Sequence, residues 1–273
     1  MSVPYAKLET LFLDAGNTLI CMNFDWIAEV LRTIGVDTNA EYVRRAEAAA
    51  RPATSARIAG ARGNDDYDLF TFHLTGLLTG LQCADGADLR GAACTPSTLG
   101  VSAAPRAQVA GDWAWASIAQ GLAARIKAPG QDYRLWSWVL PGVPEALHEL
   151  RALGLKLVVV SNSDGSVARA LEELGLGEHL DAVLDSHVVG FEKPDPRFFE
   201  HALRVSGSAP QSTAHVGDMY YQDVCGSRAA GLHSVLLDPF GDWAVDDCVR
   251  CRDLAELAGR IAAARRTRSR HGT

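Results

Sequence analysis

Short apolar runs that end in polar or small residues recur along the chain and predict buried β-strands. The first is LETLFLDAGNTLI at residues 8–20. The others come later, at KLVVVSN (156–162), DAVLDS (181–186), TAHVGD (213–218) and HSVLLD (233–238). Polar turn-forming residues bound each run, as expected for short strands that are covered on both faces.

Segments with helical spacing separate the later strands. Apolar residues recur every three or four positions over 143–153 and again over 198–205. Strands that alternate with helices of about a dozen residues form right-handed βαβ units, whose strands are parallel. The pattern therefore predicts an α/β protein, with a parallel sheet between two layers of helices.

Residues 21–139 break this alternation, because they show helical spacing and no convincing strand. We therefore expect a helical domain inserted after the first strand. The predicted division is a discontinuous sheet core (1–20 and 140–245), a helical insertion (21–139), and a C-terminal helix with a basic tail (246–273). Within the insertion, the composition of 83–108 predicts a long loop or a partly disordered excursion. The tail has five arginines and no acid after residue 259, and we expect it to be frayed.

Composition and charge narrow the class of protein. Of the 273 residues, 48% are hydrophobic and 22% are charged, which is typical of a soluble folded chain. The net charge of −7 argues against a general nucleic-acid binder, which needs a basic surface. No apolar run is long enough to span a membrane, and no signal peptide is recognisable. The six cysteines lack the spacing of a disulfide framework, so we expect a cytoplasmic protein with reduced thiols.

Polar side chains stand at the ends of three predicted strands: Asp14, Ser161 and Asp218. The carboxyl ends of parallel strands meet at one edge of a sheet, where ligands bind in this class of fold. Lys193 lies on a loop ahead of a predicted helix, and Asp223 follows Asp218 by five residues. We therefore expect these side chains to converge on one crevice.

This set of residue types fits phosphoryl transfer. Asp14 can act as a carboxylate nucleophile and form an acyl phosphate. Ser161 can hydrogen-bond a phosphoryl oxygen, and Lys193 can neutralise its charge while favouring the ionised form of Asp14. Asp14, Asp218 and Asp223 offer the hard oxygen ligands that Mg²⁺ prefers. The residues thus predict a Mg²⁺-assisted reaction on a small phosphorylated molecule.

Four motifs resemble those of the haloacid dehalogenase superfamily and occur in the family's order: DAGNTL (14–19), VVVSN (158–162), FEKPDP (191–196) and GDMYYQD (217–223). Four such motifs in order, with matching strand and loop contexts, are specific. The resemblance covers about the first twenty residues and 140–240. It implies a Rossmann-like core, a mobile C1-type helical cap formed by the insertion, and a magnesium-dependent phosphohydrolase.

The resemblance also implies roles for individual residues. They fall into catalytic (Asp14, Lys193), phosphate-binding (Thr18, Ser161, Asn162, Lys193) and metal-binding (Asp14, Gly16, Asp218, Asp223) groups. Gly16 would use its backbone carbonyl, Asp223 would support the metal from outside its own ligands, and Thr18 would help to position the nucleophile.

One position departs from the family pattern. The family's phosphatases carry an aspartate two residues after the nucleophile, which protonates the leaving alcohol and then activates water; here that residue is Gly16. Losing a general acid/base typically slows a reaction about 10²–10⁴-fold. The rate should fall least for acyl and aryl phosphates, because their leaving groups need no proton. Four insertion residues could supply a proton or could simply be helix caps, loop acids or a packed histidine: Asp25, Asp65, Asp66 and His73.

Three other functions stay open. Gly16 motivates a catalytically weak or inactive family member that keeps the metal and anion site as a binding or regulatory protein. A phosphonatase would need a cap lysine for a Schiff base, for which Lys127 is the sole candidate. A haloacid dehalogenase typically has tyrosine at the place of Gly16 and lacks the paired acids of the fourth motif.

Four tryptophans could line an apolar substrate pocket or pack against the core: Trp113, Trp115, Trp136 and Trp138.

Overall fold

The computed structural model describes residues 2–60, 68–83, 112–126 and 132–271. The chain divides into two compact units. One comprises Met1–Met22 and Trp136–Thr273, and we call it the sheet unit; the other is Asn23–Leu135, and we call it the helical unit. Several predictions fall outside the described residues: the loop that follows Cys83, the acids Asp65 and Asp66, Lys127, and the side chains of Trp113 and Trp115.

A six-stranded sheet forms the centre of the sheet unit, and all of its strand pairs are parallel. In sheet order the strands are β5 (Ala182–Asp185), β4 (Lys156–Ser161), β1 (Thr10–Leu13), β6 (Thr213–Gly217), β7 (His233–Leu237) and β8 (Val249–Cys251). The predicted α/β class with a parallel sheet is therefore confirmed. Strand β8 is the one that the sequence pattern missed, because three residues are too few to show a period.

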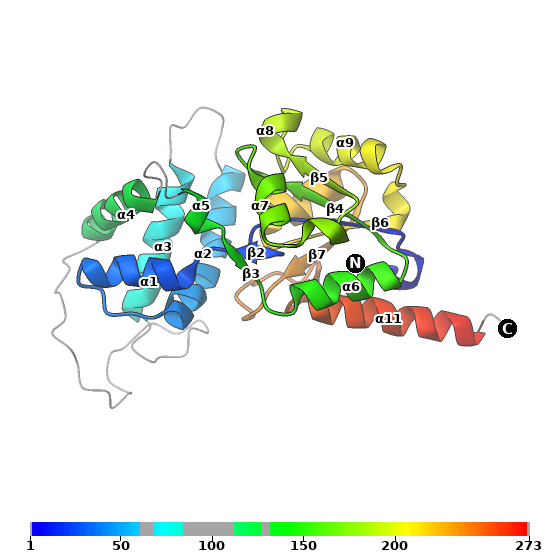
Figure 1. The fold of residues 1–273 in the computed structure, drawn as a ribbon, viewed down its shortest axis with the longest axis horizontal. Helices are drawn as coiled ribbons and strands as arrows, with labels where there is room; N and C mark the ends of the chain where they lie inside the picture. Colours follow the sequence, from blue (N-terminus) through cyan, green and yellow to red (C-terminus); the bar gives the residue numbers. More distant parts are fainter. Residues whose placement is uncertain (1, 61–67, 84–111, 127–131, 272–273) are drawn as a thin grey trace. The chain divides into compact units, whose positions relative to one another are not determined.

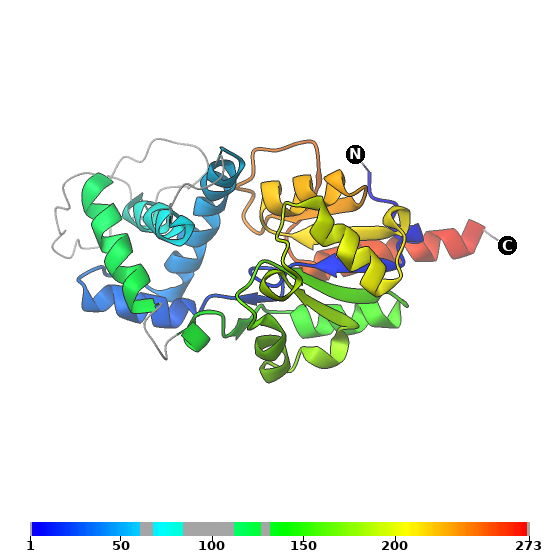
Figure 2. The same ribbon diagram turned by 90° about the horizontal axis from the view of Figure 1, so that it is seen from above.

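Helices cover both faces of this sheet (Figures 1 and 2). They are α6 (Val143–Ala152), α7 (Val167–Glu173), α8 (Ser186–Val189), α9 (Pro196–Ser206), α10 (Gly226–Ala229) and α11 (Leu254–His271). Side chains alternate along β1: Leu11 and Leu13 pack in one cluster with α6, α7 and α11, whereas Phe12 packs in a second cluster with α9. This alternation explains why the strand is apolar throughout.

Helix α11 brings the C-terminal segment onto the sheet unit. Leu257 and Ile261 are fully buried in the first of the two clusters. The guanidinium group of Arg265 donates hydrogen bonds to the backbone carbonyls of Leu8 and Leu153. The expectation of a frayed tail is therefore wrong for this part of the helix, because arginine can reach carbonyls that would otherwise be left unpaired.

A short antiparallel ribbon stands at the two joints between the units. Strand β2 (Ile20–Cys21) pairs with β3 (Trp138–Val139), with Ile20 opposite Val139. The Leu140 amide extends the contact by donating to the Leu19 carbonyl at 3.0 Å. The sequence pattern showed no strand here, because two residues on each side carry no readable alternation.

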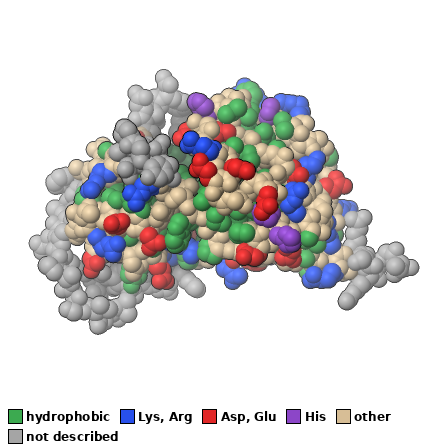
Figure 3. Space-filling view, viewed as in Figure 1, with side chains coloured by type: hydrophobic (Ala, Val, Ile, Leu, Met, Phe, Trp, Pro, Cys, Tyr) green, Lys and Arg blue, Asp and Glu red, His purple; other side chains and the backbone are tan. Residues whose placement is uncertain are grey.

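The helical unit contains α1 (Phe24–Thr33), α2 (Ala40–Gly60), α3 (Leu69–Cys83), α4 (Asp112–Ile126) and α5 (Asp132–Leu135). Helix α2 packs against both α1 and α3, and α3 packs against α4. None of the helices in the described ranges combines the length and apolar character that a membrane span requires. In Figure 3, acidic and basic side chains of the sheet unit lie interspersed on the face shown.

A buried polar cluster joins α2 to α3. Glu47 is fully buried, and its carboxylate accepts hydrogen bonds from Arg51 Nε at 3.1 Å and Nη2 at 2.5 Å. His73 Nε2 lies 3.2 Å from the same carboxylate, while its Nδ1 lies 3.0 Å from the Thr54 hydroxyl. Both ring nitrogens of His73 are thus occupied inside the helical unit, where the histidine serves packing.

This cluster makes the stability of the helical unit depend on pH. Burial alone would raise the pKa of Glu47, but Arg51 and His73 outweigh it and lower the pKa from 4.5 to about 2. A depressed pKa stabilises the fold above the unfolded value, so roughly 3 kcal/mol is present above pH 4.5 and is lost as the pH falls towards 2.

We expect Glu47→Gln to lower the free energy of unfolding of the helical unit by about 3 kcal/mol at pH 7, because it leaves Arg51 buried without its partner. The loss should shrink between pH 4.5 and 2. Urea unfolding, with hydrogen exchange of the α2 and α3 amides as the probe, measures the loss of stability and its dependence on pH. The matched control is Glu41→Gln on the exposed side of α2. Equal pH dependence in Glu47→Gln and the wild type would contradict this assignment.

Candidate active site

Three polar residues stand at the carboxyl edge of adjacent strands. Asp14 directly follows β1, Ser161 ends β4, and Asp218 directly follows β6. Since β1 pairs in parallel with both β4 and β6, these three strand ends lie side by side. The Asp14 amide donates to the Val216 carbonyl at 2.8 Å and so ties the backbone of this residue to β6.

Lys193 bridges two of the carboxylates. Its Nζ atom lies 2.7 Å from Asp14 Oδ1 and 2.7 Å from Asp223 Oδ1. All three side chains are buried, and the lysine is only 3% exposed. A buried ammonium is stable only when it is paired, so the two carboxylates hold Lys193 in place as much as it holds them.

The charges of this cluster shift the three pKa values in different directions. Burial raises the pKa of Asp14, and Lys193 offsets only part of that rise. Burial would also raise the pKa of Asp223, but Lys193 and His215 outweigh it and hold this pKa well below its usual range. Burial would lower the pKa of Lys193, yet the two carboxylates outweigh it and raise it. Lys193 and Asp223 are therefore a firmly ionised pair.

Both carboxylate oxygens of Asp223 accept hydrogen bonds. Oδ1 also accepts from His215 Nε2 at 2.9 Å, and Oδ2 accepts from the Met219 amide at 2.8 Å. The carboxylate lies so close to Gly217 that a Cβ there would be 2.3 Å from Asp223 Cγ. Only glycine at the end of β6 leaves room for this arrangement.

The loop after β1 folds back towards β6. Asn17 has a positive φ of 54°, which asparagine tolerates better than most residues, and its amide donates to the Ile20 carbonyl at 2.6 Å. Its Nδ2 donates to Asp218 Oδ2 at 3.2 Å. Thr18 is buried, and its hydroxyl has no hydrogen-bond partner among the residues that the structure describes. A buried hydroxyl without a protein partner is available to a ligand.

The Asn162 side chain forms hydrogen bonds with the loop that carries Lys193. Its Oδ1 accepts from the Lys193 amide at 2.7 Å, and its Nδ2 donates to the Lys193 carbonyl at 2.9 Å. Both ends of the carboxamide are thus used by one residue, which orients the lysine towards Asp14. Phosphate binding by Asn162 and by Ser161 stays a prediction.

The acidic residues fit a divalent metal. Asp14, Asp218 and Asp223 each offer a carboxylate oxygen, and these atoms lie within 4.8 Å of one another. All three are buried, and Lys193 pairs with two of them, Asp14 and Asp223, so two carboxylates share one ammonium. A hard dication such as Mg²⁺ would balance this charge with the oxygen ligands that it prefers. A contribution from the Gly16 carbonyl stays a prediction.

The same region has no acidic side chain at position 16. An ideal Cβ at Gly16 would lie 3.2 Å from two ring atoms of Trp136, Cη2 and Cζ3. Trp136 is half-buried and packs against the core of the sheet unit. Trp138, two residues on, is 44% exposed. The two tryptophans therefore have different surroundings, although the sequence treats them alike.

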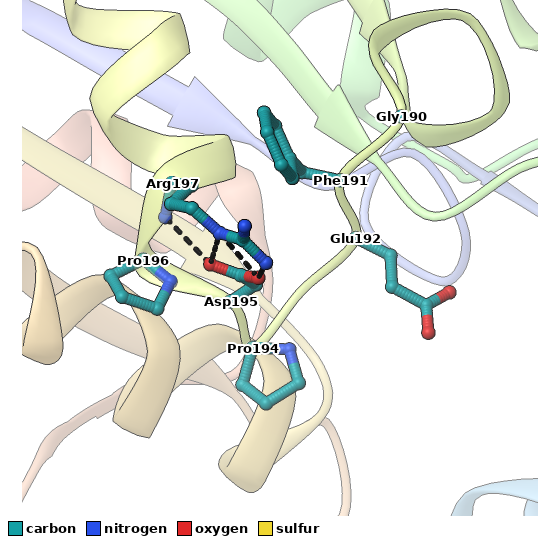
Figure 4. Close-up of a pocket in the computed structure, with 7 residues that line it drawn as sticks. All are labelled: Gly190, Phe191, Glu192, Pro194, Asp195, Pro196 and Arg197. Atoms are coloured by element: carbon teal, nitrogen blue, oxygen red, sulfur yellow. Dashed lines mark hydrogen bonds and ion pairs between the residues drawn. The ribbon is translucent and has the colours of Figure 1, made fainter. Parts of the chain in front are cut away.

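The loop that carries Lys193 also lines a pocket (Figure 4). Its wall is made by Gly190, Phe191, Glu192, Pro194, Asp195, Pro196 and Arg197. The Arg197 guanidinium is paired with Asp195, at 2.5 Å for the shortest contact, and lies 4.4 Å from the centre of the Phe191 ring. These groups satisfy one another and begin helix α9, with Asp195 as its N-cap. The cation of this pocket is therefore already paired.

Sequence reasoning missed His215 and Gly217 as parts of the site. A histidine inside an apolar buried strand was a readable signal, because a buried imidazole needs a polar partner. No local signal marks Gly217, because its role depends on the turn that brings the Asp223 carboxylate back against the end of β6. Asp25, considered as an alternative proton donor, is exposed in the first turn of α1.

The fold and this cluster together define a class of protein. Residues 8–231 match a family described as haloacid dehalogenase-like hydrolase. The chain belongs to this family of hydrolases.

Known relatives agree with that assignment over part of their length. A human haloacid dehalogenase-like hydrolase domain-containing protein 3 is 47% identical over 112 residues, which are 41% of this chain and 44% of the human protein. A phosphoserine phosphatase from Thermus thermophilus is 43% identical over 102 residues, 36% of this chain and 41% of that protein. The matched segments thus cover less than half of these relatives.

One solved structure shows the shared fold over nearly the whole chain. YfnB from Bacillus subtilis, bound to magnesium, aligns with a TM-score of 0.56 over 93% of this chain and 98% of that one, at 16% identity.

Proposed function

We propose that the sheet unit carries a Mg²⁺-dependent phosphohydrolase site in which Asp14 is the nucleophile. The observation that carries this proposal is the Lys193 ammonium placed 2.7 Å from both Asp14 and Asp223, among three carboxylates whose oxygens approach within 4.8 Å. The similarity to a phosphoserine phosphatase supports a phosphorylated small molecule as the substrate.

In this proposal each residue has one task. Asp14 attacks phosphorus and becomes an aspartyl phosphate, which water then hydrolyses. Lys193 keeps Asp14 oriented and offsets negative charge on the transferring group. Ser161 and Thr18 offer hydroxyls to phosphoryl oxygens. Asp14 and Asp218 would hold Mg²⁺, with Asp223 supporting the site from outside the metal's own ligands, and the ion would neutralise negative charge on the substrate.

The helical unit has a separate task in this proposal. We infer that residues 21–139 form a C1-type cap that selects the substrate, with 1–20 and 140–245 as the core. A binding or regulatory protein is the second candidate function, and the observation that favours it is the absence of a general acid at Gly16. The two candidates differ in turnover rather than in metal binding.

Metal removal tests the proposal. We expect phosphate release from acetyl phosphate and 4-nitrophenyl phosphate with Mg²⁺, and a loss of about 10³-fold or more with EDTA, because the buried carboxylates then repel the anionic substrate. Adding Mg²⁺ back should restore release. Calorimetric titration with Mg²⁺ reports binding independently. Binding without any phosphate release would support the regulatory candidate instead, and release that survives EDTA would contradict the metal assignment.

A further inference from the structure

Trp136 fills the space into which a side chain at position 16 would point. An ideal Cβ on Gly16 would lie 3.2 Å from Cη2 and from Cζ3 of the indole, and 3.9 Å from Cε3. Carbon atoms in ordinary contact are about 3.5–4.0 Å apart. The ring therefore approaches the backbone more closely than a residue with a Cβ would allow without displacement.

The ring is anchored against such a displacement. Trp136 packs on the buried core of the sheet unit. The segment that follows it is fixed by the pairing of β3 with β2 and by the Leu140 amide, which donates to the Leu19 carbonyl at 3.0 Å. An aspartate at position 16 would extend a carboxylate beyond the Cβ, so it would have to push the indole away or turn aside from it.

The position of the ring determines which groups lie next to Gly16, close to Asp14 in the chain. Gly16 follows Asp14 by two residues, so their Cα atoms are at most about 7 Å apart. The indole carbons near Gly16 cannot carry a proton, and the indole N–H is a hydrogen-bond donor that does not titrate. An aromatic ring therefore lies where the side chain of a general acid at position 16 would begin.

We propose that Trp136 stands in the place of the absent side chain and forms the wall against which the leaving group lies. The inference rests on the proposed phosphohydrolase function. It names the substrate class as phosphoryl compounds whose leaving group departs as a stable anion, which are acyl phosphates and phosphates of acidic alcohols. Aromatic leaving groups gain further from stacking on the indole.

The reaction balances without a proton from the protein. As an Asp14 oxygen bonds to phosphorus, the bond from phosphorus to the leaving oxygen breaks, and the electron pair stays on that oxygen as phenolate or carboxylate. Water then adds to phosphorus, the bond to Asp14 breaks with its electrons returning to the carboxylate, and the water proton passes to solvent. With no base at Gly16, the second step is slow, so the leaving group is released in a burst.

A series of phosphate esters tests this substrate class. Wild-type kcat/KM should fall steeply as the leaving-group pKa rises from nitrophenol through phenol to an alkyl alcohol, with a penalty of about 10²–10⁴-fold for the alkyl ester that a general acid would have removed. Trp136→Ala should keep the steep dependence of kcat/KM on leaving-group pKa. Its preference for aryl over acyl leaving groups should be about two- to tenfold weaker than that of the wild type. Trp138→Ala, the matched control, should keep that preference.

Substitutions at Gly16 test the steric exclusion. Gly16→Ala should lower Tm by a few degrees in the wild type and by less in the Trp136→Ala background, because residues in contact are energetically coupled. Gly16→Asp should gain little activity on alkyl phosphates, whereas Gly16→Asp combined with Trp136→Ala should gain about tenfold or more and show a shallower dependence on leaving-group pKa.

Two results would overturn the inference alone: activity that is insensitive to leaving-group pKa, or an equal gain from Gly16→Asp with and without Trp136. Failure of the proposed function looks different, because then no substrate, acetyl phosphate included, releases phosphate or labels Asp14; that result overturns both.

Discussion

Replacing Asp14 with asparagine is expected to lower kcat by about 10⁴-fold or more, because the amide cannot form the covalent phosphate intermediate. Asparagine has nearly the same size and can still accept a hydrogen bond from the Lys193 ammonium, which lies 2.7 Å from Asp14 Oδ1. The Lys193 ammonium would also keep its ion pair with Asp223, so we expect the variant to remain folded.

Two measurements separate this loss of chemistry from a loss of structure. Single-turnover reactions with labelled acetyl phosphate, quenched in acid, should trap a hydroxylamine-sensitive phosphate on the wild type and none on Asp14→Asn. Thermal unfolding should show the variant fully folded. Asp246→Asn, an exposed acid of the same sheet unit, is the matched control and should retain activity and label. Equal labelling of Asp14→Asn would remove Asp14 as the nucleophile.

Gly217→Ala is expected to disrupt the same site by displacing the Asp223 carboxylate. The added Cβ would lie 2.3 Å from Asp223 Cγ and 2.3 Å from its Oδ2. The carboxylate cannot retreat without losing its hydrogen bonds with Lys193, His215 and the Met219 amide. We expect a loss of roughly 3 kcal/mol in the free energy of unfolding, a Mg²⁺ affinity at least about tenfold weaker, and little turnover.

A glycine elsewhere provides the matched control for this substitution. Gly259 lies in α11, and a Cβ added there would meet no atom within 4 Å. Gly259→Ala should therefore leave Mg²⁺ binding intact and raise stability by up to about 1 kcal/mol, because alanine favours helix over glycine. Urea unfolding and calorimetric Mg²⁺ titration measure both variants. Unchanged stability and Mg²⁺ affinity in Gly217→Ala would show that Asp223 is free to move and plays no part in the site.

The residues that sequence reasoning placed together are those with a local signal. Asp14 and Asp218 each follow a short apolar run, and a parallel sheet brings such strand ends to one edge. Lys193 sits just ahead of a helix with a clear N-cap at Asp195. Each of these positions could be read from a few neighbouring residues, so the α/β fold and the set of polar side chains could be predicted together.

Other parts of the fold had no such signal. Strands β2, β3 and β8 contain two or three residues each, too few to show a period, and they are defined by their partners across the sheet. The Asn162 carboxamide was a member of a motif, but its reciprocal hydrogen bonds with the Lys193 backbone depend on the return path of a loop.

The sequence by itself determined the parallel sheet and the edge at which the polar groups gather, because strand periodicity and residue type are local properties of the chain. The missing acid at Gly16 followed from the resemblance of its motifs to those of the family. Tertiary structure alone decided that Trp136 lies on Gly16, that His215 supports Asp223 and that Gly217 makes room for it. Those contacts depend on strand register and on side-chain direction across neighbouring elements, which are settled only when the core packs.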